Sequence, residues 1–199
     1  MEIFWNTIAR YNAATWPWQI AIVAAAAVLT VLLYLRPTQN VKRAMKLFLA
    51  GLNAWIAVVY YLVWCGQRSH SDVLALFWGI MAVIWLYDLY ADFTRFERTS
   101  RPNGFALLLY LMPLAYPLFS LARGLSFPMM TMPVMPCSVA VFTIGLMLAF
   151  THRINIFLVL FLCHWALIGL AKVYFFGIPE DFLLNTLYPL PVLPSAYSA

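Results

Sequence analysis

The chain has 199 residues, of which 65% are hydrophobic and 10% are charged, and its net charge is +5. Soluble domains carry about 25% charged residues and cannot bury so much apolar surface, so this composition excludes a soluble globular protein. Nucleic acid is not an expected partner, because the basic residues are spread over the gaps between apolar stretches.

Long apolar stretches are the main feature of the chain. Asp, Glu, Lys and Arg are absent from residues 11–35, 47–67, 102–122, 124–152 and 154–171, and the stretch 73–91 carries only Asp88. About twenty apolar residues in a helix cross the hydrocarbon core, and these runs lack the alternation of barrel strands. The sequence therefore predicts an all-α integral membrane bundle of about six transmembrane helices in one domain, with spans at 17–35, 47–65, 73–91, 104–122, 136–151 and 154–176.

The basic residues between these spans predict the orientation. One side of the membrane would carry Arg36, Lys42, Arg43, Lys46, Arg95, Arg98, Arg101 and Arg153, and the other side Arg10, Arg68, Arg123 and Lys172. Short cytoplasmic loops are enriched in Lys and Arg. Both termini are therefore expected outside the cytoplasm, and the surrounding lipid bilayer is the first expected partner.

Asp88 is the one carboxylate inside an expected span. It lies about one turn from the cytoplasmic end of the third span, and Asn53 in the second span is a candidate partner at similar depth. Acids within a membrane usually face the bundle interior or a wet cavity and are often functional. The structural alternative is a hydrogen bond near Arg95 at the membrane interface.

The fifth span is irregular, because prolines at 128, 133 and 136 precede a short apolar run. A helix from Pro136 to Thr151 is only about 24 Å long, and proline is favoured at the first helical position. The N–H groups of Cys137 and Ser138 would then attract an anion or a polar ligand, as broken spans do in many transporters. The alternative is a re-entrant connector with a structural helix start.

The methionines beside Cys137 would suit Cu(I), but their spacing fits no specific metal motif, so no metal site is predicted. Small residues at 145 and 149 would let two helices approach closely. Cys65 and Cys137 are expected on the same outer side, which leaves a disulfide between them as an option.

His164 lies near the middle of the sixth span. It could relay protons, ligate haem or form a hydrogen bond across helices. The sequence contains no recognisable catalytic motif and does not identify a cofactor, so no enzymatic activity is expected.

The tail 179–199 has three prolines after a short apolar run. It cannot cross as a helix and is expected at the outer interface or against a neighbouring subunit.

Several strings resemble an uncharacterised family of bacterial multi-pass membrane proteins, domain of unknown function 6064. They are YNAATWPWQ (11–19), YPLFSLARG (116–124), PCSVAVFTIGLML (136–148) and WALIGLAKVYFFGIPEDFLL (165–184). The chain departs from the family pattern at Gly124-Leu125, where Gly-His is usual, and at the methionines before Pro136. The resemblance implies a bacterial cytoplasmic (inner) membrane and about six helices, but no substrate.

Two functions remain open at this point. The first is translocation of a small solute or ion through the bundle, with the fifth span as the binding element and Asp88 and His164 tuning protonation. The second is a non-catalytic scaffold or assembly subunit, acting as a homo-oligomer or within a larger membrane complex.

Overall fold

The computed structural model describes residues 2–66, 70–97 and 104–176, so the tail 179–199 lies outside the described part of the chain. Its helices are α1 (Glu2–Leu35), α2 (Gln39–Trp55), the π-helix η1 (Ile56–Trp64), α3 (Ser71–Ala91), α4 (Gly104–Ala122), α5 (Pro136–Phe150) and α6 (Ile156–Phe176). Two short strands, β1 (Arg95–Phe96) and β2 (Thr151–Arg153), pair antiparallel. The predicted all-α bundle with a short, proline-headed fifth helix is confirmed.

Four helical segments of the described chain have the length and apolar composition of a membrane span: α1, α2 continued by η1, α3 and α4. α5 is an apolar helix of only 15 residues and is shorter than these four. Large apolar side chains such as Leu35, Leu76 and Leu118 are more than half exposed on the outer surface of the bundle. That surface fits hydrocarbon as its solvent.

α1 begins at Glu2, well before the expected start at residue 17. Its 34 residues would extend about 51 Å, more than the thickness of the hydrocarbon core. The added N-terminal turns bury Ile8 and Tyr11 against the bundle. Hydropathy alone misses these turns because they mix polar and apolar residues and are stabilised by packing.

α2 also begins earlier than expected, at Gln39, where the Thr38 side chain accepts a hydrogen bond from the N–H of Val41 as an N-cap. Because of this early start, Lys46 belongs to the helix and is not a loop residue. The helix continues without a break as η1, so the second span ends in wider π-helical turns.

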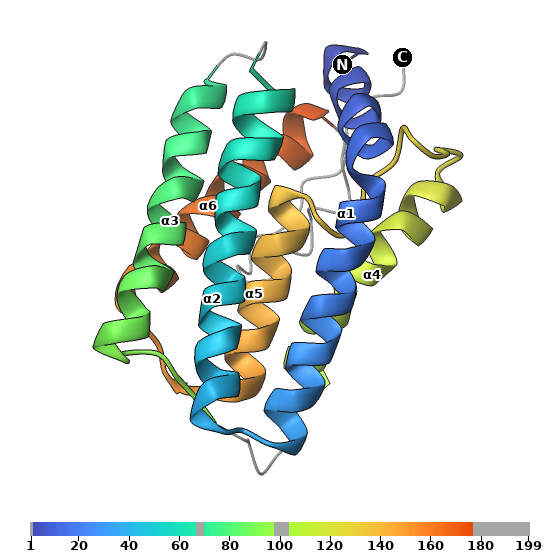
Figure 1. Cartoon of the computed structure of the whole chain (residues 1–199). Coiled ribbons are helices and arrows are strands. Elements are labelled where there is room, and N and C mark those ends of the chain that lie inside the picture. The colour runs from blue at the N-terminus through green and yellow to red at the C-terminus, as the bar shows by residue number, and fades with distance from the viewer. Residues whose placement is uncertain (1, 67–69, 98–103, 177–199) are drawn as a thin grey trace.

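α2 lies beside α3. α5 lies in the middle of the bundle and packs against α4 (Figure 1). A Cβ atom added to Gly145 would come within 2.4 Å of the backbone nitrogen of Tyr110. α5 therefore rests directly on the α4 backbone, as the small residue at 145 led us to expect. Figure 1 shows that α5 begins well inside the bundle, below the upper ends of α3 and of the continuous helix formed by α2 and η1.

Candidate functional site

Asp88 is fully buried in the last turn of α3 and forms an ion pair with Lys46 of α2. The distance from Lys46 Nζ to Asp88 Oδ2 is 2.9 Å. The Asp88 carboxylate also accepts a hydrogen bond from the N–H of Thr94, at 3.1 Å from Oδ1. Lys46 and Asp88 are the two charged residues buried within the described chain. Their pairing neutralises two charges that would each be very unfavourable alone in an apolar interior.

Asp92 ends α3 in the left-handed conformation, with a φ of 50°, which Asp tolerates better than most residues. Its Oδ1 accepts a hydrogen bond from Lys46 Nζ at 2.8 Å, and Lys46 donates to the Asp88 carbonyl as well. The hydrogen bond from Lys46 is the main cause that lowers the pKa of Asp92 below its ordinary value, against an opposing effect of burial. Asp92 is therefore a charged acceptor at the edge of the same cluster.

The cluster extends to the start of α6 through Thr94. The Thr94 hydroxyl oxygen accepts a hydrogen bond from the N–H of Asn155 at 3.2 Å, and Asn155 Oδ1 accepts one from the N–H of Phe157. Next to this contact, β1 pairs with β2. We call Lys46, Asp88, Asp92, Thr94 and Asn155 the charged network. It joins α2 and α3 to the connection between α5 and α6.

The structure does not pair Asp88 with Asn53. Asn53 is buried in α2, where its Nδ2 donates to the Leu49 carbonyl at 2.7 Å and its Oδ1 has no hydrogen-bond partner. Arg95 pairs with Asp92 and not with Asp88: its Nε lies 3.7 Å from Asp92 Oδ2. The sequence alone places Lys46 in a loop, because this residue immediately precedes the apolar run 47–67.

Cys137 and Ser138 lie at the start of α5 and are both buried. The Ser138 hydroxyl donates to the Met132 carbonyl at 3.0 Å, and the N–H of Val139 bonds the Met135 carbonyl. The chain's own residues before Pro136 therefore cover the helix start that was considered as a ligand site.

The proline- and methionine-rich segment 126–135 is held by the first helix. Tyr11 donates its hydroxyl proton to the Val134 carbonyl at 2.7 Å, and Asn12 Nδ2 donates to the carbonyls of Pro128 and Met130 at 2.9 and 2.7 Å. Trp55 Nε1 donates to the Tyr11 hydroxyl in turn. We call Tyr11, Asn12, Trp55 and the three carbonyls the neutral network. It satisfies backbone groups that would otherwise be unpaired at membrane depth.

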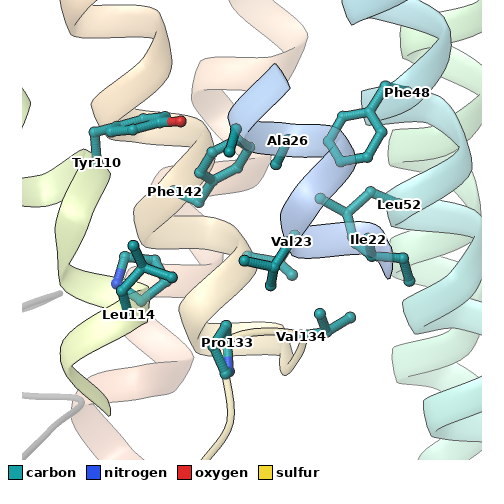
Figure 2. A pocket seen from close by; sticks show the side chains of 13 residues that line it. Ile22, Val23, Ala26, Phe48, Leu52, Tyr110, Leu114, Pro133, Val134 and Phe142 are labelled. Atoms are coloured by element: carbon teal, nitrogen blue, oxygen red, sulfur yellow. The ribbon is translucent and has the colours of Figure 1, made fainter. Parts of the chain in front are cut away.

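A cavity of about 70 Å³ lies between α1, α2, α4 and α5 (Figure 2). Figure 2 shows Phe48 and Leu52 on one side, Tyr110 and Phe142 on the other, and Pro133 at one end. The lining is almost entirely apolar and includes none of the five candidate residues Asn53, Asp88, Cys137, Ser138 and His164. An apolar cavity of this size accommodates hydrocarbon better than water or ions.

His164 lies apart from both networks, on the outward face of α6. Its side chain is exposed, and its ring lies 5.6 Å from the ring of Phe77, between centroids. The described residues contain no group of three His, Cys, Asp or Glu side chains that could hold a metal ion. Cys65 and Cys137 are buried and do not form a disulfide with each other.

Residues 1–192 match a protein family of unknown function, DUF6064. The chain belongs to this family. No curated protein and no solved structure matches the chain. In this DUF6064 protein, one stretch that carries the family resemblance, residues 11–19, supplies Tyr11 and Asn12, and another, residues 136–148, forms most of α5. Tyr11 and Asn12 bind carbonyls of the segment 126–135. This segment directly precedes α5 and therefore connects α1 to the start of α5.

Proposed function

We propose that this DUF6064 protein is a non-catalytic assembly subunit in a bacterial cytoplasmic membrane. The observation that carries the proposal is the closure of the charged network, in which Lys46 and Asp88 form an ion pair and Asp88 also accepts a hydrogen bond from the N–H of Thr94. Ionisable groups within spans that serve transport usually face a wet cavity. Here both are enclosed by protein and act as a connection between helices.

The cavity supports the same proposal. An ion or a polar solute needs a pathway whose lining replaces its hydration shell. The cavity between α1 and α4 offers apolar side chains instead, and its volume of about 70 Å³ leaves little room for a hydrated solute.

The described basic residues support a cytoplasmic position for the end of the bundle that carries β1 and β2. Arg36, Lys42, Arg43, Arg95 and Arg153 lie at this end, and Arg10 and Arg123 lie towards the other. Lys46 lies within α2 and is therefore not counted among the loop charges, but the end that carries β1 and β2 still has more basic residues than the opposite end. We propose on this basis that both termini lie outside the cytoplasm.

The proposal is tested by purification of the full chain in a mild detergent, followed by mass spectrometry of everything that stays bound. An assembly subunit should purify with other membrane polypeptides, or as more than one copy, in a fixed ratio. A protein that purifies only as a monomer from its native membrane at native expression level would contradict the proposal.

Translocation of a small solute or ion is a second candidate, favoured by one observation. α5 begins inside the bundle, and the irregular residues Pro133 and Val134 line the cavity next to it, as broken spans do in transporters. Flux into liposomes that contain the purified protein tests this candidate. Translocation predicts flux above that of empty liposomes, reduced by Asp88→Asn or His164→Ala; unchanged flux in both variants would exclude the proposed role of these residues.

A further inference from the structure

The outward face of α6 carries a seam of regularly spaced side chains. Phe157, Leu160, His164 and Leu167 follow one another at intervals of three, four and three residues, and all four are exposed. This is the spacing at which a helix packs lengthwise against another helix in a left-handed pair. α6 also contacts α3 and α5 of its own chain, and its buried side chains Leu158, Leu162 and Trp165 lie on a different side of the helix from this seam.

His164 distinguishes this seam from an ordinary lipid-facing surface. It is the ninth residue of a helix with 21 residues, so it lies about 12 Å from the helix start, near the middle of the span. An imidazole exposed to hydrocarbon is unfavourable, and ionisable residues within spans almost always face protein or a wet cavity. The described residues give the imidazole a ring contact with Phe77 but no hydrogen bond.

The position of His164 in the seam indicates which molecule binds this face of α6. In a pair of copies related by a two-fold axis along the membrane normal, residues on the axis meet their own counterparts at the same depth. A neutral imidazole has one donor and one acceptor nitrogen, so two such rings can form a hydrogen bond with each other. A second copy therefore supplies the missing partner at the correct depth, without any other component.

We propose that the Phe157–Leu160–His164–Leu167 face of α6 binds the same face of a second copy of this chain. The inference rests on the proposed assembly role and names its first component. The adjacent Cys163 provides a natural probe, because its side chain is exposed beside the seam, whereas Cys65 and Cys137 are buried.

The experiment uses the full chain in liposomes at a low protein-to-lipid ratio, treated with a short bis-maleimide and separated on a denaturing gel. The expected result is a cross-linked dimer that disappears in Cys163→Ala. A matched control adds Leu111→Cys to that variant, which places an exposed thiol on α4, and should give no dimer. His164→Ala should weaken the association roughly three- to fifteen-fold, as expected for one hydrogen bond between helices, and His164→Asn, which keeps a donor and an acceptor, should weaken it less.

Three outcomes would overturn the inference. A Cys163 that reacts with a monofunctional maleimide but forms no dimer has no second Cys163 within reach of the cross-linker, and a Cys163 that reacts with neither reagent is not accessible beside the seam. A cross-link to a different polypeptide would also reject the second copy, but it would leave the assembly role standing. Absence of any bound polypeptide in the mass-spectrometry experiment would instead remove the assembly role itself.

Discussion

The two networks hold the two ends of the same bundle by different chemistry. At the end that carries β1 and β2, an ion pair between Lys46 and Asp88 holds the α3 terminus and, through Thr94, the start of α6. Towards the opposite end, Tyr11 and Asn12 hold the segment 126–135 with uncharged donors and backbone carbonyls. Each network attaches a connecting segment to a helix from a distant part of the sequence.

The difference between the two networks lies in how they should fail. Removing one partner of a buried ion pair leaves the other charge without compensation, so the energetic loss is large and affects every attached element. Neutral hydrogen bonds to backbone carbonyls are lost individually, each with a modest effect. The charged network should therefore behave as one unit, and the neutral network as a set of separable contacts.

Lys46→Ala should have the largest effect on stability. The substitution leaves the buried Asp88 carboxylate unpaired, which costs about 3–5 kcal/mol in the free energy of unfolding. Thermal unfolding in detergent measures the loss, with the exposed Arg43→Ala on the same helix as the control. A combined Lys46→Met and Asp88→Leu variant should lose less than the two single variants together; strict additivity would show that the two side chains are not coupled.

Asn12→Ala should have the second-largest effect on stability. We expect a loss of about 1–2 kcal/mol in the free energy of unfolding, because the carbonyls of Pro128 and Met130 both lose their hydrogen-bond donor. The damage should be local. The Cys137 thiol, which lies close to this segment, should react faster with maleimide, while the Cys65 thiol keeps its rate. Asn6→Ala, at an exposed position of α1, is the control. An equal rise at both thiols would mean that the neutral network also fails as a unit.

Tyr11→Phe tests a single contact of the neutral network. The substitution removes the donor to the Val134 carbonyl and the acceptor for Trp55 but keeps the ring that packs edge-on against Tyr60. We expect a loss of about 1 kcal/mol or slightly more in the free energy of unfolding, below that of Asn12→Ala. A loss as large as that of Lys46→Ala would contradict the distinction between the two networks.

Apolar run length and helix signals predicted most of the fold. They placed α4 at 104–122 and the proline-headed start of α5 at Pro136, where proline fits the first helical position. They failed where packing decides the boundary, as in the first turns of α1. The side chains of Ile8 and Tyr11 are buried by contacts with the rest of the bundle, which no local pattern contains.

The candidate site was harder to predict for a related reason. Asp88 was recognised because an acid inside an apolar run is conspicuous, but its partner Lys46 immediately precedes such a run and resembles a loop charge. The helical spacing of Lys46, Ala50 and Asn53 places them along one side of α2, and this signal indicates that Lys46 can lie in the bundle. The role of Asn12 depends on carbonyls more than a hundred residues away, so the sequence offers no comparable signal.

Low pH should weaken the charged network through Asp92, and this should be the smallest of the predicted effects on thermal stability. Lys46 lowers the pKa of Asp92 in the folded protein, so the charged carboxylate stabilises the fold above the ordinary pKa of Asp, and this contribution is lost as the pH falls through the lowered value. Thermal midpoints of the wild type and Asp92→Asn should differ near neutral pH and converge as the pH falls below about 4. Because the Asp92 side chain is 45% exposed, solvent screens the interaction and the difference should be small.

A difference that persists unchanged in acid would mean that Asp92 acts through its left-handed backbone conformation and not through its charge. The same titration of Asn12→Ala should show a constant offset from the wild type, because no group of the neutral network changes its charge in this range.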